Sequence, residues 1–421
     1  MFDSSFKTFP TEIHSLILSY HQPYVKLGVD AWDDDDSFAY DEQMRFASEL
    51  CLVNRAFYCI MQPLLHATFF VYLSENDLVN RFPVVQKNHR WITRLVFWGE
   101  ESPDEFPDCP IWDFIPLCEN LKTLELIDFH KVFDVHYTEG ADDMAQKFLS
   151  PITSTQLTTL SILTREEDPL EFEGNEAPVT ILQHLTKEVA ARIELLIIDY
   201  WGSGTTELER IPRQRFSSLR RLELLHVQLM EDYPCDFMKA LTSTSPSLDV
   251  AVASTPPIRE LHAQDMSEEF ADVFFTRILP TNNLGLGLRY LYFSILHVGD
   301  SESLSSFPLL LSQQCPQLEV LLYFVPCPVT FLDNLPVRLK KFGVMLWAIR
   351  DVYSSEEYGT PRLCPESILE WANDAERRRE IETLVIAWGQ RIDQKVQDEA
   401  AKQLESGVRD IHLSISNEYS S

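Results

Sequence analysis

A short hydrophobic pattern recurs through most of the chain and constrains its fold more than any other feature. The pattern is an aliphatic residue, two other residues, an aliphatic residue, one other residue and a further aliphatic residue. Successive copies start 21 to 42 residues apart in the 421-residue sequence. The eleven copies start at Ile92, Leu121, Leu157, Ile193, Leu219, Ile258, Leu288, Leu318, Leu339, Ile381 and Val408.

The alternation within each copy predicts a short strand. The last two apolar residues are two positions apart, so they point to one face of a strand, and the first packs the turn before it. Amphipathic stretches such as PCDFMKALTST and ESILEWANDAERRRE lie between copies and favour helices. Stacked strand–helix units form a solenoid with a parallel sheet on one face and helices on the other. The spacing is typical of leucine-rich repeats that contain several long units.

An ordinary α/β domain with short buried strands is the alternative. The intervals between copies are irregular, and the asparagine or cysteine that usually follows the third leucine is absent. We predict an α/β solenoid because eleven copies exceed what chance alternation supplies, and we expect irregular repeats. Three copies end in Trp-Gly, at Trp98, Trp201 and Trp388, and we interpret these as turns in which glycine frees the backbone.

Composition excludes several classes of protein. Hydrophobic residues make up 45% of the chain, which is enough for a real core. The 35 basic and 65 acidic residues argue against binding to nucleic acid or an anionic membrane, because phosphate is bound by Lys and Arg. The N-terminus has no basic region followed by an apolar run, and the eight cysteines contain no C-x-x-C pair. We therefore expect reduced thiols and a cytoplasmic or nuclear location.

The first 73 residues lack the recurring hydrophobic pattern, and they predict a small helical module. FPTEIHSLILSY predicts a helix that begins at Pro10 and ends near Tyr20. Residues 24–45 contain the acidic insertion DAWDDDDSFAYDE, which we interpret as a solvated loop because its consecutive acids do not match a calcium loop. A second helix is expected over about residues 42–54 and a third over about residues 56–62, ending at Pro63. The repeats would then occupy residues 74–421.

The apolar stretch from Cys51 to Leu73 decides how this module works. A membrane span is improbable because the stretch contains Asn54, Arg55, Gln62, Pro63 and His66. It is therefore either a buried core helix or a docking surface. Three short helices cannot bury all their apolar residues among themselves, so a partner or the first repeats must cover the remainder.

Two segments of the module resemble the halves of the F-box motif. Residues 9–13, FPTEI, are similar to Leu-Pro-x-Glu-Ile, and residues 50–57, LCLVNRAF, are similar to Leu-x-Leu-Val-x-Arg-x-Phe. QPLLHATFFVYL is similar to the exit found in fungal members, where the chain leads into the first strand. The chain departs from the family at Phe9, at His66 and in about twenty extra residues between the halves. That insertion either leaves the docking face alone or weakens docking.

The resemblance implies a role in a cullin–RING (SCF-type) ubiquitin ligase. The module would bind a Skp-type adaptor, and cullin through it, while the repeats would capture a protein substrate. The alternative is a repeat scaffold that binds proteins outside any ligase, with the helical module as a cap. The residues expected to contact the adaptor are Phe9, Pro10, Ile13, Ile17, Leu52, Val53 and Phe57.

No sequence motif indicates catalysis. The chain contains neither G-x-x-x-x-G-K-[ST] nor G-x-G-x-x-G, and it lacks G-x-S-x-G, H-E-x-x-H and a cysteine array for zinc. We expect no enzymatic activity, no cofactor and no metal. The expected partners are proteins.

A row of strand residues is the candidate substrate face. In each strand, the residue between the last two aliphatic positions and the residue after them face away from the helices. The row is apolar and aromatic with some acids, as protein-binding surfaces are, although long loops that cover it would give the same pattern. The candidate substrate-binding residues are Trp98, Glu125, Asp199, Glu223, Tyr292 and Phe324.

Overall fold

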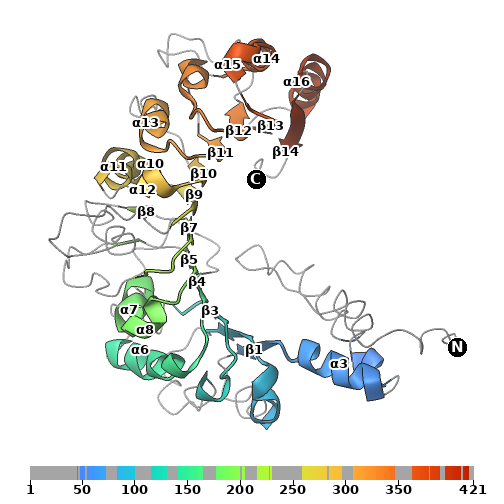
Figure 1. Ribbon diagram of the computed structural model, residues 1–421, viewed down its shortest axis with the longest axis vertical. Coiled ribbons are helices and arrows are strands. Elements are labelled where there is room, and N and C mark those ends of the chain that lie inside the picture. Colours follow the sequence, from blue (N-terminus) through green and yellow to red (C-terminus); the bar gives the residue numbers. More distant parts are fainter. Residues whose placement is uncertain are drawn as a thin grey trace, which may run out of the picture. The chain divides into compact units, whose positions relative to one another are not determined.

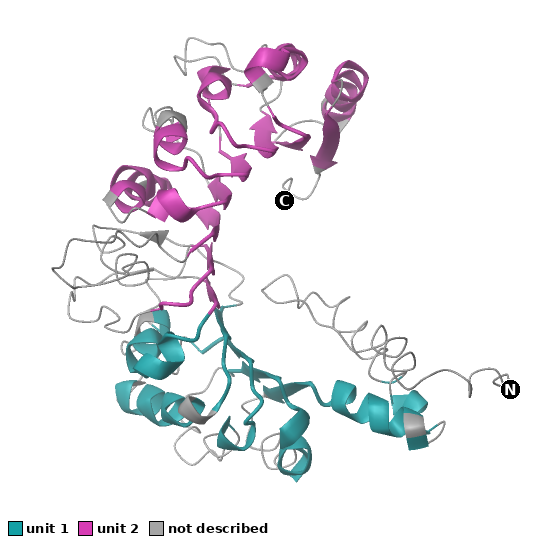
Figure 2. Ribbon diagram, viewed as in Figure 1, with its two compact units in different colours: residues 1–168, 176–193 teal, residues 169–175, 194–421 magenta. Residues whose placement is uncertain are grey.

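The structure is a computed structural model of the chain. It describes residues 45, 48–52, 55–72, 83–99, 115–129, 141–164, 177–199, 202–203, 216–226, 228–229, 258–281, 284–295, 307–325, 327, 329–346, 363–378, 380–388, 394–408 and 411–416. The chain divides into two compact units, coloured separately in Figure 2. Unit 1 contains residues 1–168 and 176–193, and unit 2 contains residues 169–175 and 194–421.

Unit 1 alternates helical turns with four strands of a parallel sheet. Its strands are β1 (Thr68–Tyr72), β2 (Arg94–Trp98), β3 (Thr123–Ile127) and β4 (Thr159–Leu163). Its α-helices are α3 (Arg55–Leu65), α6 (Ala141–Leu149), α7 (Ala177–His184) and α8 (Lys187–Ala190). Short 3₁₀ turns are η3 (His89–Trp91), η6 (Ile115–Leu117) and η7 (Ser150–Ser154). Residues 48–52 and 83–88 are also helical.

Unit 2 repeats the alternation with eight strands of the parallel sheet. These strands are β5 (Leu195–Asp199), β7 (Arg221–Leu225), β9 (Glu260–Met266), β10 (Tyr290–Ile295), β11 (Val320–Phe324), β12 (Lys341–Leu346), β13 (Thr383–Trp388) and β14 (His412–Ser416). Two short strands, β6 (Gly202–Ser203) and β8 (Gln228–Leu229), pair with each other. The helical elements are α10 (Glu268–Val273), the π-helical turn η9 (Phe274–Ile278), α11 (Leu279–Thr281), α12 (Leu284–Gly287), α13 (Phe307–Gln314), the 3₁₀ turn η11 (Val329–Asn334), α14 (Pro365–Asn373), α15 (Ala375–Arg378) and α16 (Gln394–Gly407).

The twelve strands of the parallel sheet follow the order of the sequence, as β1-β2-β3-β4 in unit 1 and β5-β7-β9-β10-β11-β12-β13-β14 in unit 2. Ten of these strands begin at the third residue of a copy of the hydrophobic pattern. The α/β class with a parallel sheet is therefore confirmed. The other two are β1 and β14. β1 begins at Thr68, where no copy was predicted. In β14, Leu413 lies opposite Leu384, so the copy starts two residues later than predicted.

A backbone contact recurs at the start of most strands. The N–H groups of Thr93 and Arg94 both donate to the carbonyl oxygen of Ala67, each at 2.9 Å. Equivalent pairs before β3, β4, β7 and β9 through β13 donate to one carbonyl just before the neighbouring strand. Each of these strands therefore starts level with its neighbour.

One face of each strand forms the hydrophobic core. The residues at the two aliphatic strand positions, such as Leu124 and Leu126 or Leu291 and Phe293, are buried in every main-sheet strand except β14, where Leu413 and Ile415 are only partly buried. In Figure 1, α6 to α8 lie on one side of the unit 1 strands, and α10 to α13 lie on one side of β9 to β11. Burying each of these large apolar side chains contributes about 1.5–3 kcal/mol to folding.

Two local expectations are wrong. Helix α3 continues through Pro63 to Leu65, because proline in the last turn removes only one hydrogen bond and the N–H of His66 still bonds the carbonyl of Gln62. Gly99 is needed because the chain passes close to the backbone of Asp128, and not because the backbone needs extra freedom: a Cβ atom there would lie 2.4 Å from the carbonyl oxygen of Asp128.

Among the described helices, none combines the length and the apolar character needed to cross a membrane.

Candidate functional site

The register of the strands places one row of side chains on the sheet face opposite the core. In unit 1 the row contains Val96, Glu125 and Ser161. In unit 2 it contains Ile197, Glu223, His262, Tyr292, Leu322, Gly343, Val385 and Ser414. Parallel pairing without slippage is what brings residues so far apart in sequence onto one face.

An apolar cluster occupies this face in the C-terminal half of unit 2. It consists of Tyr290, Tyr292, Leu322, Phe324, Met345, Val385 and Ala387. Tyr292, Phe324 and Ala387 are buried, whereas the other four are only partly buried. Gly343 leaves the space that Leu322 fills, because a Cβ atom there would lie 2.6 Å from Leu322 Cδ2. The apolar cluster therefore has a packed base and a partly exposed rim.

Charged residues lie beside the apolar cluster and bind one another. Arg221 Nε lies 2.6 Å from Glu223 Oε1, and Arg221 Nη1 lies 3.7 Å from Glu260 Oε2. His262 stacks on Tyr290 and Tyr292 with ring centroids 4.6 and 5.9 Å apart. Burial, together with the charge of Arg221, lowers the pKa of His262 to about 4, so its ring is neutral at pH 7.

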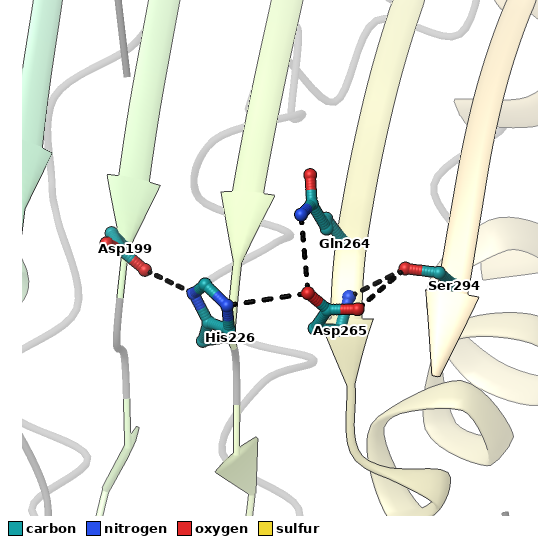
Figure 3. A network of polar contacts seen from close by, with 5 residues as sticks. All are labelled: Asp199, His226, Gln264, Asp265 and Ser294. Atoms are coloured by element: carbon teal, nitrogen blue, oxygen red, sulfur yellow. Dashed lines mark hydrogen bonds and ion pairs between the residues drawn. The ribbon is translucent and has the colours of Figure 1, made fainter. Parts of the chain in front are cut away.

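A polar network joins the carboxyl ends of four neighbouring strands (Figure 3). His226 Nδ1 lies 2.9 Å from Asp199 Oδ1, and His226 Nε2 lies 3.4 Å from Asp265 Oδ2. The Ser294 hydroxyl donates to Asp265 Oδ1 at 3.2 Å and accepts from the Asp265 N–H at 2.8 Å. Gln264 Nε2 donates to Asp265 Oδ2 at 3.3 Å.

Local backbone geometry creates this network. Ala263 pairs with Phe293 and Met266 pairs with Ile295, so β9 has one more residue than β10 in this interval. Asp265 is in the left-handed region at φ 54° within this bulge, which turns its carboxylate toward His226 and Ser294. His226, at φ 49°, follows β7 directly, and its N–H donates to the carbonyl of Gln264 at 2.9 Å.

The electrostatics of the network favour a charged histidine. Burial lowers the pKa of His226, but hydrogen bonds to Asp199 and Asp265 and their negative charges outweigh burial and raise it to about 9. Burial likewise opposes the ionised form of Asp265, yet its bonds to His226, Gln264 and Ser294 lower its pKa below the ordinary value. At pH 7 the imidazolium therefore links two carboxylates, and it has no free nitrogen with which to accept a proton.

This arrangement holds strands together and does not resemble a nucleophile with its base. The Ser294 hydroxyl donates to Asp265 and not to the histidine, and the lowered pKa of Asp265 makes that carboxylate a weak base. Within the described ranges, no group of three or more His, Cys, Asp or Glu side chains is arranged to hold a metal ion. We assign the network to stabilisation of β5, β7, β9 and β10.

A buried ion pair lies on the same sheet face in unit 1. Arg94 Nε and Nη2 donate to the two carboxylate oxygens of Glu125 at 2.5 and 3.0 Å. Glu125 is fully buried, and burial raises its pKa while the hydrogen bonds and charge of Arg94 oppose that shift. Without Arg94, the Glu125 carboxylate would be buried in the row with no opposite charge beside it.

The described part of the helical module exposes apolar side chains. Phe57 packs with Leu50 and Met61 in a small core, at 6% exposure. Leu52 is 86% exposed and Tyr58 is 44% exposed. An exposed leucine beside a packed core is the kind of feature that a partner protein covers.

The predicted site residues therefore lie in different surroundings. Of the expected adaptor contacts, Leu52 is exposed and Phe57 is buried, whereas Phe9, Pro10, Ile13, Ile17 and Val53 lie outside the described residues. Of the expected substrate contacts, Glu125, Asp199, Tyr292 and Phe324 are buried, and Trp98 and Glu223 are partly buried. The substrate role of these six residues stays a prediction.

Sequence reasoning did not find several residues that the site depends on. These are Arg94, His226, His262, Asp265 and Ser294. The sequence did contain a signal for this network. Asp199 and His226 are polar residues that lie at, or just after, the last strand position of two neighbouring copies of the pattern.

The fold defines an α/β protein with a parallel sheet covered by helices. Comparison with known proteins adds no narrower identity, because no protein-family model matches the chain and no curated protein is similar to it.

Proposed function

We propose that this chain is a non-catalytic substrate-recognition subunit of a cullin–RING ubiquitin ligase, in the cytoplasm or nucleus. Its helical module would bind a Skp-type adaptor, and its repeat face would bind a protein substrate. The observation that carries the proposal is the exposure of Leu52, at 86%, in the segment that resembles the second half of the F-box motif. A free leucine there is consistent with a docking role, because burial by a partner would stabilise the complex.

The repeat face supports the second half of the proposal. The rim of the apolar cluster, formed by Tyr290, Leu322, Met345 and Val385, is partly exposed over a packed base. Tyrosine and methionine are enriched at protein interfaces, and a base whose buried residues come from the three strands β10, β11 and β13 limits the entropy that binding costs. A solenoid of irregular leucine-rich repeats is the architecture that we propose for the sheet and its helices.

The adaptor interaction is tested by co-purification with the Skp-type adaptor of the same organism. The variant is Leu52→Asp, and the matched control is Val337→Asp, which places the same charge at a residue that is 68% exposed in unit 2. We expect the wild type and the control to bind and Leu52→Asp to bind at least about tenfold more weakly, because a buried carboxylate without a partner is costly. Equal melting temperatures establish that both variants are folded.

Absence of binding by the wild type at about 10 μM would remove the ligase from the proposal. A repeat scaffold that acts outside any ligase is the second candidate, and the apolar cluster favours it independently of the module. Adaptor binding that is unchanged in Leu52→Asp would assign docking to another surface.

A further inference from the structure

Charge is distributed unevenly along this acidic chain. Acidic residues outnumber basic residues by 65 to 35 over the whole sequence. Nevertheless, the described residues between positions 50 and 99 include Arg55, Lys87, Arg90 and Arg94 and no Asp or Glu. Among the described residues, Arg94 is the only one of these four cations that pairs with a carboxylate, that of Glu125 on the next strand. The described residues of this range therefore carry a net positive charge.

Four side chains form a basic-aromatic patch at the entry to the first two strands. The patch consists of His66, Lys87, Arg90 and Trp91. The ring of His66 stacks on that of Trp91, with centroids 6.0 Å apart and planes 9° apart, and Arg90 Cζ lies 4.4 Å from the centroid of Trp91. Lys87 and Arg90 are exposed, and neither makes an ion pair with any described residue. An exposed cation pair beside a flat aromatic surface is therefore available to a ligand.

The backbone under the patch is well anchored. Asn120 Nδ2 donates to the carbonyl of Arg90 at 2.7 Å, and the N–H of Ile92 donates to the carbonyl of His89 at 3.1 Å. Ile92 and Leu95 directly after the patch are fully buried. Burial and the nearby charge of Lys87 lower the pKa of His66, so its ring contributes a neutral face at pH 7. The cations are therefore presented on a fixed base, which lowers the entropy that a ligand must overcome.

We propose that the basic-aromatic patch binds an acidic segment of a partner protein. Carboxylates would meet Lys87 and Arg90, and an apolar side chain of the segment would lie beside Trp91 or on Val84, which is 39% exposed in the helical segment of residues 83–88. Charge complementarity selects this occupant, because Lys87 and Arg90 are exposed and neither is paired with a carboxylate among the residues that the structure describes. Nucleic acid is disfavoured, since a long polyanion would also meet the field of a chain with net charge -30.

The patch is distinct from the Leu52 surface and from the apolar cluster. Its partner is therefore independent of the ligase proposal, and loss of adaptor binding would not affect it. Glu119 precedes Asn120, whose side chain bonds the carbonyl of Arg90. Its negative charge would repel an acidic segment that extended from the patch toward Asn120.

The test uses the full chain and a fluorescein-labelled peptide of about fourteen residues in which Glu and Asp alternate with Leu. Anisotropy is measured with the wild type, with Lys87→Glu/Arg90→Glu, and with Lys340→Glu/Lys402→Glu, which changes the net charge equally at two exposed lysines of unit 2. We expect the patch variant to bind about tenfold more weakly than the wild type and the control to bind within about twofold. Raising the salt from about 50 to 300 mM should weaken wild-type binding.

Three results would overturn the proposal, provided that all proteins melt at the same temperature. The first is no binding of the acidic peptide at about 100 μM. The second is an equal loss in both variants, which would show a general effect of net charge. The third is displacement by about 5 mM inorganic phosphate at constant ionic strength, which would assign the patch to phosphate ligands.

Discussion

The imidazole of His226 lies between two carboxylates, with Nδ1 2.9 Å from Asp199 Oδ1 and Nε2 3.4 Å from Asp265 Oδ2. Asp199 is fully buried at the end of β5, and Asp265 occupies the bulge of β9. His226 follows β7, the strand between them in the sheet. One cation therefore connects three neighbouring strands at a point where their carboxylates would otherwise repel.

The free energy lost by replacing this cation should depend on pH in a defined way. The pKa of His226 is about 9 in the folded state against an ordinary value of 6.5, so its contribution is complete below pH 6.5 and is lost as the pH rises through 9. We expect His226→Gln to lower the free energy of unfolding by on the order of 3 kcal/mol at pH 6 and by clearly less at pH 9.5. Urea unfolding of both proteins between these pH values measures the difference.

The matched control for this experiment is His184→Gln in unit 1. His184 Nε2 lies 3.1 Å from Asp142 Oδ1, but half of that carboxylate side chain is exposed. We expect a loss below about 1 kcal/mol at pH 6. A difference between wild type and His226→Gln that stays constant from pH 6 to 9.5 would contradict the charged state of His226.

The Arg94–Glu125 pair should behave as a coupled unit. Arg94→Met removes the cation beside a fully buried carboxylate, and we expect it to destabilise unit 1 by about 3 kcal/mol or more. Arg94→Met/Glu125→Leu also removes the carboxylate, and we expect it to recover stability to within about 1 kcal/mol of the wild type. Denaturant titrations of both single variants and the double variant complete the cycle. Additive losses would mean that the two side chains do not interact.

Two glycines should respond differently to alanine. A Cβ atom at Gly99 would lie 2.4 Å from a backbone oxygen of Asp128, whereas one at Gly407 would lie 2.5 Å from Leu369 Cδ2 at the end of a flexible side chain. Gly99→Ala should therefore cost about 2 kcal/mol or more, and Gly407→Ala should change stability by less than about 1 kcal/mol. Thermal melts of the two variants compare them. Equal melting temperatures would show that the turn after β2 adjusts.

The strands could be predicted because their signal is local. Two aliphatic residues on one face and a third before the strand recur in each copy, and ten strands begin where the pattern places them. The error at β14 has the same origin. A shift of two residues leaves every side chain on the same face, so alternation cannot distinguish Val408 from the position two residues later.

The contacts within the candidate site could not be predicted from the sequence. His226 and Asp265 are 39 positions apart, and their approach depends on a bulge that no hydrophobic pattern encodes. The burial of Tyr292 and Phe324, against the partial exposure of Tyr290 and Met345, likewise depends on packing across four strands. The stacking of Arg90 on Trp91 required the turn that places consecutive side chains together.

By itself, the sequence determined the α/β class, the strand positions and the side of each strand that enters the core, because hydrophobic period is a property of a few consecutive residues. It also determined the acidity of the chain and the apolar character of the segment around Leu52. Only the tertiary structure decided which charges are paired and which aromatic residues are buried. Those properties depend on residues from different repeats meeting across the sheet, and a distance between two side chains far apart in sequence exists only once the strands have paired.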